Sequence, residues 1–227
     1  MQMTLYKCEY CNSDFKREST LAVHMCRQKQ RHMQEGDHDV QLAFRTYQLF
    51  YKVSTNSKKD KSYGDFAKSP YYAAFIKFAN YCIDVKIDSI ENYTMWLIRN
   101  GVKLDNWASD QQFNTWIKRR FKEESVDRAV ERSVLFMQRW AEEEKCAWAD
   151  YFKNIHPNVA VLHICAGRIS PWILYGSDTA QELLGRLNDE QIKMVVEYIE
   201  PDFWQIRMKR KPTDYDWVKE IMEKAGL

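Results

Sequence analysis

The chain of 227 residues is poor in the residues that interrupt helices, with only 7 glycines and 5 prolines. Alternating β-branched residues are also scarce, so the sequence does not support a fold built from many short strands and tight turns. Apolar residues recur instead at three- and four-residue intervals, which is the spacing of amphipathic helices. We therefore predict a mostly α fold.

Long apolar runs and a strong charge of one sign are likewise missing. The longest apolar candidate, around residues 159–165, is interrupted by His163 and falls well short of the about 18 residues that a membrane span needs. The N-terminus has no apolar signal region, so we expect neither a membrane location nor secretion. The 34 basic and 32 acidic residues leave a net charge of +2, and any surface for a polyanion must therefore be local.

The six cysteines are unevenly placed along the chain. Three lie within the first 26 residues, whereas Cys82, Cys146 and Cys165 are scattered among aromatic and apolar residues. This distribution is typical of metal-bound and buried thiols in a reducing compartment, and not of a disulfide framework. We therefore expect a cytoplasmic protein.

Recognisable catalytic motifs are also lacking. The sequence contains no phosphate-binding glycine loop, no H-E-x-x-H helix and no G-x-S-x-G elbow. His156 and His163 lie in an otherwise apolar region, where a packed or surface histidine is a simpler interpretation than a catalytic base. We therefore predict that the protein is not an enzyme.

The first third of the chain does contain a metal-binding pattern, Y-x-C-x2-C-x3-F-x5-L-x2-H. Its metal-ligand positions are Cys8, Cys11 and His24, and its apolar positions are Tyr6, Phe15 and Leu21. The pattern resembles zinc fingers of the two-cysteine, two-histidine kind, which implies a bound Zn²⁺ and a small ββα fold. A module of fewer than 30 residues cannot bury enough apolar surface to fold alone, and zinc supplies on the order of 10 kcal/mol or more.

The fourth zinc ligand is ambiguous in the sequence. Zinc fingers of this kind place the second histidine three to five residues after the first, whereas seven residues separate His24 from His32. In an unbroken helix the two histidines would be about 12 Å apart. Cys26 is the alternative ligand, but on a regular helix it points about 200° away from His24, so the helix would have to end early. We favour His32 and keep Cys26 as the alternative.

A helical domain follows a polar joint at residues 34–39. Predicted helices begin near Glu18 and cover residues 40–51, 71–82, 93–99, 110–122, 125–152, 192–199 and 217–225, with a loop at residues 54–62. Asn100-Gly101 predicts a helix end, Ser170-Pro171 a helix start, Asn188 with Gln191 a capping box, and Glu200-Pro201 a break. We thus predict a zinc finger at residues 1–35 and an irregular all-helical domain at residues 36–227, with a possible boundary near residues 155–170.

The finger also suggests a nucleic-acid interface. Fingers that bind DNA read bases from helix positions −1, 3 and 6, which here are Arg17, Thr20 and Val23. An arginine can bind guanine with two hydrogen bonds, and the basic residues after the finger helix can contact phosphates. The residues that we expect to contact DNA or RNA are Arg17, Thr20, Arg27, Lys29 and Arg31. A second basic run, residues 207–211, follows Phe203-Trp204 and could bind single strands, although a solvated face explains it better.

Two segments of the larger domain carry a resemblance over most of the chain. The phrases S-P-Y-Y-A-A-F at residues 69–75 and G-R-I-S-P-W at residues 167–172, together with the finger, resemble those of zinc-finger proteins of tailed bacteriophages. The resemblance transfers no activity, but it implies the cytoplasm of an infected bacterium. We expect a zinc-dependent nucleic-acid-binding accessory protein for phage replication, recombination or transcription, whose helical domain docks a partner protein. The alternative is a protein-interaction adaptor with a structural finger.

Overall fold

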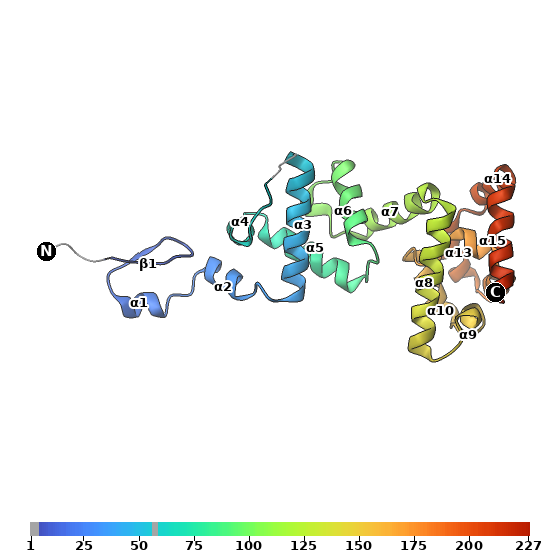
Figure 1. The fold of residues 1–227 in the computed structure, drawn as a ribbon, viewed down its shortest axis with the longest axis horizontal. Helices are drawn as coiled ribbons and strands as arrows, with labels where there is room; N and C mark the ends of the chain where they lie inside the picture. The colour runs from blue at the N-terminus through green and yellow to red at the C-terminus, as the bar shows by residue number, and fades with distance from the viewer. Residues whose placement is uncertain (1–4, 56–58) are drawn as a thin grey trace. The chain divides into compact units, whose positions relative to one another are not determined.

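The computed structural model describes residues 5–55 and 59–227. Within these residues helices dominate, with fifteen α-helices, two short 3₁₀ helices and one two-stranded sheet (Figure 1). The predicted mostly α class, with a small ββα element at the start, is confirmed. The predicted loop at residues 54–62 lies partly outside the described residues, and its first two residues belong to a helix.

The chain divides into two compact units, Met1–Ser109 and Asp110–Leu227. The predicted boundary after residue 35 falls inside the first unit, and the possible boundary near residues 155–170 falls inside the second. Both stay predictions about which segments fold independently. In the described residues no helix combines the length and the apolar character that crossing a bilayer requires.

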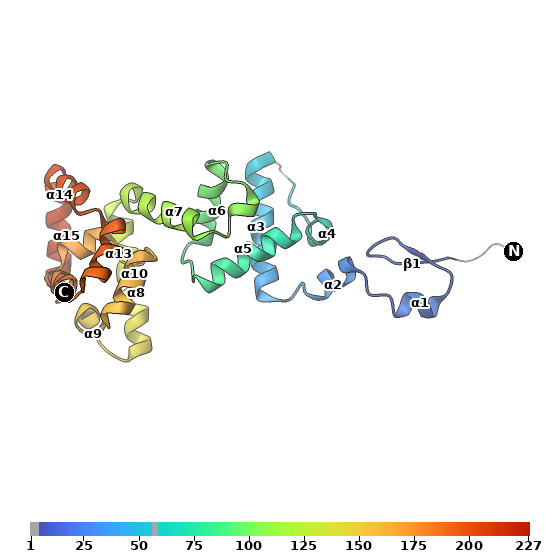
Figure 2. The same ribbon diagram turned by 180° about the vertical axis from the view of Figure 1, so that it is seen from behind.

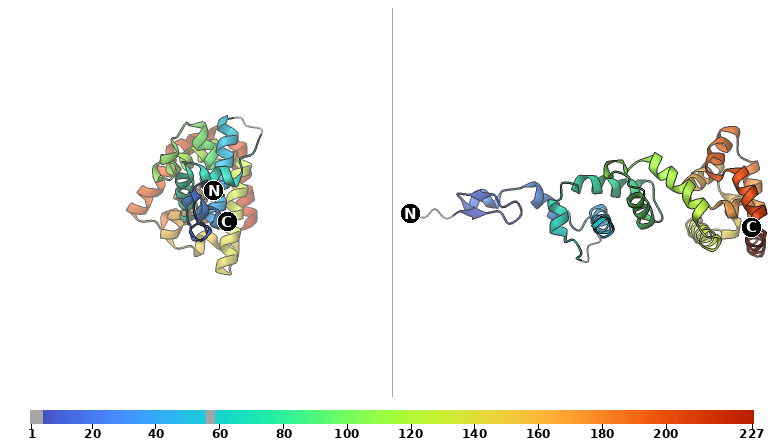
Figure 3. Two further views of the ribbon diagram at one scale, coloured as in Figure 1. Left: turned by 90° about the vertical axis from the view of Figure 1, so that its left-hand side faces the viewer. Right: turned by 90° about the horizontal axis from the view of Figure 1, so that it is seen from above.

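The first unit begins with an N-terminal module, residues 5–33, seen at the blue end of the chain in Figure 3. Strands β1 (Tyr6–Lys7) and β2 (Asp14–Phe15) form an antiparallel hairpin in which Tyr6 pairs with Phe15. Helix α1 (Glu18–Ala22) starts where the sequence predicts but has only five residues. A second short helix, α2 (Arg27–Met33), completes the module.

The rest of the first unit is a small helical bundle. It consists of α3 (His38–Thr55), α4 (Tyr63–Lys68), α5 (Tyr72–Asp84), α6 (Ile90–Arg99) and the 3₁₀ helix η1 (Leu104–Asn106), with α3 packed against α5 (Figure 2). Its core is aromatic, because Phe66, Phe75, Phe78 and Trp107 have no exposed surface. Trp107 lies edge-on to Phe75 and Phe78, with ring centroids 6.0 and 5.2 Å away. Each such pair stabilises the fold by about 0.5–1.5 kcal/mol beyond area burial.

The second unit holds the remaining helices. They are α7 (Asp110–Glu123), α8 (Val126–Glu144), the 3₁₀ helix η2 (Trp148–Asp150), α9 (Tyr151–Asn154), α10 (Pro157–Cys165), α11 (Pro171–Gly176), α12 (Asp178–Gly185), α13 (Asp189–Ile199), α14 (Pro201–Arg210) and α15 (Pro212–Ala225). Helix α10 packs against α13, and α11 against α15. Trp172 and Trp204 meet edge-on in the core, 5.3 Å between centroids.

The structure confirms several of the predicted helix boundaries and contradicts others. Ser170 caps α11, the Asn188–Gln191 box caps α13, and Gly101, with φ +64°, follows the end of α6, as predicted. The single helix predicted for residues 125–152 is wrong. Helix α8 ends at Glu144 because Lys145 takes a left-handed conformation, with φ +56°. The last helix starts at Pro212, five residues earlier than predicted, since proline suits the first turn.

Candidate metal centre

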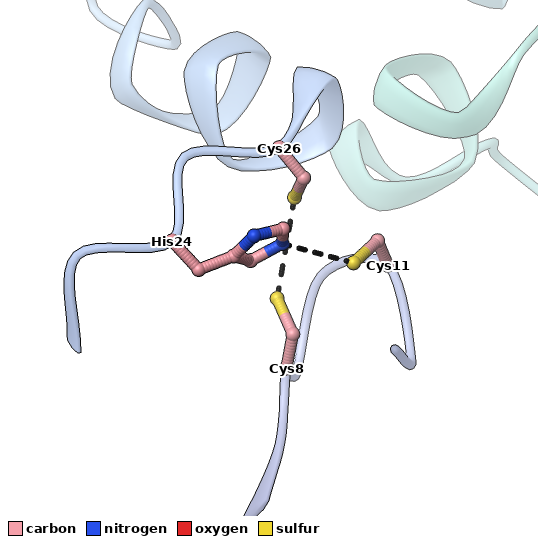
Figure 4. Close-up of side chains that lie close together, drawn as sticks. All are labelled: Cys8, Cys11, His24 and Cys26. Carbon is pink, nitrogen blue, oxygen red and sulfur yellow. Dashed lines mark hydrogen bonds between the residues drawn. The ribbon is translucent and has the colours of Figure 1, made fainter. Parts of the chain in front are cut away.

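Four side chains of the N-terminal module converge on one point (Figure 4). They are Cys8, Cys11, His24 and Cys26, and their ligand atoms all lie within 4.8 Å of one another. The sulfurs of Cys8 and Cys26 are 4.0 Å apart, and Cys11 Sγ is 3.3 Å from His24 Nε2. The group can hold a metal ion with four protein ligands.

Cys8 and Cys11 are presented by the tight turn of the hairpin. The N–H of Cys8 donates to the carbonyl of Ser13 at 2.9 Å, and the N–H of Asn12 donates to the carbonyl of Cys8 at 2.8 Å. Asn12 has φ +60°, a left-handed conformation that asparagine tolerates better than most residues. The turn therefore brings both sulfurs to the same side, as the C-x2-C spacing predicts.

His24 and Cys26 are presented by the non-helical segment between α1 and α2. Helix α1 ends at Ala22, so His24 is no longer helical, and Cys26 has extended backbone angles, φ −82° and ψ 163°. The early helix end thus removes the 200° separation that a continuous helix would impose on these two ligands.

The preference for His32 as the fourth ligand is corrected in favour of Cys26. His32 lies on α2 and packs between aromatic rings, 5.1 Å from the Tyr10 centroid and 5.3 Å from the Tyr63 centroid. It is not part of the four-residue cluster. The physical reason is that α2 begins right after Cys26 and directs His32 towards the helical bundle, where it fills a gap between two tyrosines.

The three thiols have unequal surroundings. The hydrogen bond between the Cys11 and Ser13 side chains, at 3.2 Å, together with the Ser13 backbone and His24, lowers the pKa of Cys11 to about 6. Desolvation raises the pKa of Cys26, although the N–H of Lys29 donates to its sulfur at 3.4 Å. Since a metal binds the thiolate, the lowered pKa of Cys11 favours metal binding by this residue.

The donor set and spacing fit zinc. Zn²⁺ is bound tetrahedrally by cysteine sulfur at about 2.3 Å, which places two sulfurs about 3.8 Å apart. The Cys8–Cys26 separation of 4.0 Å is close to that value. Three cysteines and one histidine leave no open position for substrate, which is the arrangement of structural zinc sites. Phe15, with its ring centroid 4.6 Å from that of His24, shields one side of the imidazole.

The residues expected to contact nucleic acid differ in their exposure and in their hydrogen bonds. Arg17, Thr20 and Arg27 are exposed, and Lys29 is half-buried with its Nζ donating to the His24 carbonyl at 3.4 Å. Arg31 differs, because its Nη1 donates to the carbonyls of Ala67 at 2.7 Å and of Ser69 at 3.3 Å. Arg31 therefore binds the chain's own backbone, and we remove it from the set of phosphate contacts.

The aromatic, basic and histidine residues that the sequence analysis noted in the second unit are engaged in packing or in helix capping. Trp204 is fully buried, so it offers no surface for a base, and Arg207 lies over its ring at 5.1 Å from the centroid. The Tyr151 hydroxyl and His163 Nδ1 are 2.8 Å apart in the interior. His156 accepts the N–H of Asn158 and caps α10. These contacts agree with packing and capping roles.

No model of a protein family, no curated protein and no solved structure matches this chain. The zinc-finger and bacteriophage resemblances therefore rest on the quoted residues alone. What the geometry adds is a group of three cysteines and one histidine that is able to hold a metal ion.

Proposed function

We propose that the N-terminal module is a zinc finger with three cysteines and one histidine, and that it binds nucleic acid. The observation that carries this proposal is the distribution of charge. The module has six basic and three acidic residues, whereas the rest of the chain has 28 basic and 29 acidic residues. The whole positive excess of the protein is therefore concentrated in fewer than 30 residues around the metal centre. Such a local excess favours binding to a polyanion.

The exposed basic residues lie on both sides of the metal ligands along the chain. Arg17 precedes α1 and Arg27 opens α2, while His24 and Cys26 lie between them. A metal held by these ligands would fix the two segments relative to each other and so limit the positions that Arg17 and Arg27 can take. Thr20, exposed on α1, adds a hydroxyl and a methyl group that can contact a base edge.

Fluorescence anisotropy with labelled DNA and RNA, each single- and double-stranded, tests this proposal. We expect the zinc-loaded protein to bind at ~50 mM salt and to weaken steeply towards ~200 mM, because phosphate contacts release counterions. The triple variant Arg17→Ala, Arg27→Ala, Lys29→Ala should bind more weakly and with a salt slope lower by about 2–3. The matched control is Arg128→Ala, Lys153→Ala, Lys193→Ala, which removes the same charge from exposed positions of the second unit. No binding at low salt, or equal losses in both variants, would refute the proposal.

A second candidate function is a protein-docking module. The observation in its favour is the exposure of apolar side chains in the module: Val23, next to His24, is 81% exposed, Met25, between His24 and Cys26, is 49% exposed, and Met33, at the end of α2, is 70% exposed. An adaptor predicts that Val23→Ser with Met25→Ser abolishes capture of one stoichiometric partner after nuclease treatment. It also predicts that this double variant leaves nucleic-acid binding unchanged, which separates the two functions.

A further inference from the structure

Helix α2 connects the metal centre to the helical bundle of the first unit. At its N-terminus the sulfur of Cys26, a metal ligand, accepts the N–H of Lys29 at 3.4 Å and so caps the helix. Near its C-terminus, five residues further on, Arg31 contacts the bundle. The helix has only seven residues, and a helix of this length has almost no stability of its own in water. Its conformation therefore depends on the contacts at its two ends.

The first contact with the bundle is a charged clamp on α4. Arg31 Nη1 donates to the carbonyls of Ala67 and Ser69, at the C-terminal end of that helix. The guanidinium also lies 4.2 Å from the ring centroid of Tyr72, at the start of α5. A cation at a helix C-terminus is favoured by the helix dipole and by the unpaired carbonyls there. Partial burial of the guanidinium lowers the pKa of Arg31.

The second contact runs from the metal-binding turn itself. Tyr10 lies between the ligands Cys8 and Cys11 in the sequence, and its ring packs on His32 of α2. His32 packs in turn edge-on against Tyr63 of α4. The hydroxyl of Tyr63 donates to the carbonyl of Arg31. Helix α2 thus donates a hydrogen bond to α4 through the Arg31 side chain and accepts one from α4 through the Arg31 carbonyl.

We propose that metal occupancy is coupled to the packing of α4 and the start of α5, with α2 as the connecting element. Without metal, a module this small cannot keep its fold. Cys26 and Tyr10 then lose their fixed positions, and α2 loses what orders its first turn. Arg31 and His32 leave the bundle, and α4, which has six residues, loses its clamp. This inference rests on metal binding by the four ligands, but it does not depend on nucleic acid as the target.

The coupling is reciprocal by thermodynamic necessity. If metal binding stabilises the docked α2, then the docked α2 must strengthen metal binding by the same factor. Loss of the clamp should therefore weaken zinc affinity, although Arg31 is not a ligand. A coupling of ordinary size corresponds to about a 5- to 150-fold change in affinity.

Hydrogen exchange of the full chain, with zinc and with a chelator, tests the inference. We expect the amides of α4 and of the first turn of α5 to exchange at least ~10-fold faster after chelation, because the local opening becomes easier. Amides of α13 in the second unit serve as the internal reference and should not change. The metal content of the same samples shows whether the centre was loaded.

Two variants and one control isolate the clamp. Arg31→Ala and Tyr63→Phe should each still bind one zinc at saturation, but with a lower zinc affinity, measured by competition with a zinc-binding dye. In both variants, chelation of the zinc should no longer accelerate amide hydrogen exchange in α4. Tyr63→Phe keeps the ring in the bundle, so it remains informative if Arg31→Ala folds poorly. Gln30→Ala, on the same helix but exposed, should match the wild type in zinc affinity and in the exchange of α4.

A wild-type protein that binds one zinc and shows the same α4 exchange with and without chelator would overturn the coupling while leaving the metal centre intact. A protein that binds no zinc would overturn both the coupling and the proposed finger. Normal coupling in a protein that fails to bind any nucleic acid would refute only the proposed function.

Discussion

The sulfurs of Cys8 and Cys26 lie 4.0 Å apart although 18 positions separate them in the chain. This proximity exists because α1 stops at Ala22 and the chain from His24 to Cys26 is no longer helical. The cluster consequently contains three sulfurs and one nitrogen, a donor set with high affinity for zinc. Cys26 is thus both a member of this candidate metal site and the cap of α2.

Replacing Cys26 by serine should remove most of the metal affinity while keeping a side-chain acceptor at the N-cap of α2. Serine is a preferred N-cap, so the first turn of α2 keeps a side-chain acceptor for the Lys29 N–H. The thiolate ligand, however, is lost. We expect about one zinc per chain in the wild type and much less in Cys26→Ser after dialysis, measured by mass spectrometry of the metal. Retention of a full equivalent would show that Cys26 is not a ligand.

Replacing His32 by alanine should leave the zinc content unchanged. The imidazole packs between Tyr10 and Tyr63 and lies outside the ligand group. We expect His32→Ala to hold one zinc at saturation and to lose affinity only through the weakened packing of α2. The metal measurement used for Cys26→Ser gives the comparison, and loss of the metal in His32→Ala would instead restore the two-histidine site.

Metal removal should expose three additional reactive thiols. Burial raises the pKa of Cys82 to about 12 and that of Cys165 to about 11, so at neutral pH these thiols stay protonated and react slowly. Counting fast-reacting thiols by a colorimetric disulfide reagent should therefore give three more per chain after chelation, from Cys8, Cys11 and Cys26. Denaturant should expose all six cysteines. An equal count with and without chelator would contradict metal protection.

Gly167→Ala should destabilise the second unit. Gly167 has φ +74°, and a Cβ there would lie 2.5 Å from Ile117 Cδ1. The left-handed conformation costs about 1–2 kcal/mol for other residues, and overpacking adds about 1–3 kcal/mol, so we expect a loss of about 2–5 kcal/mol. Urea unfolding followed by circular dichroism measures it. Gly185→Ala is the control, because its Cβ meets nothing within 4 Å and alanine favours the helix.

Local signals explain the parts of the fold that the sequence predicted well. Caps at Ser170 and Asn188 depend on a side chain and a backbone N–H two or three residues away, so their outcome is decided within one turn of chain. The C-x2-C turn is local in the same sense. The predicted helix through residues 125–152 failed because Lys145, which carries no helix-stop signal of its own, takes a left-handed conformation.

Three ligands, the hairpin and the mostly helical class were determined by the amino-acid sequence alone, because each depends on spacing within a few residues. The choice of Cys26 over His32 and the use of Arg31 were decided only by the tertiary structure. Arg31 and Tyr63 are 32 residues apart. No short-range pattern indicates that the Tyr63 hydroxyl will donate to the Arg31 carbonyl, or that the Arg31 guanidinium will donate to the Ala67 carbonyl. Contacts of that range depend on how the whole bundle packs, and packing is a property of the folded chain.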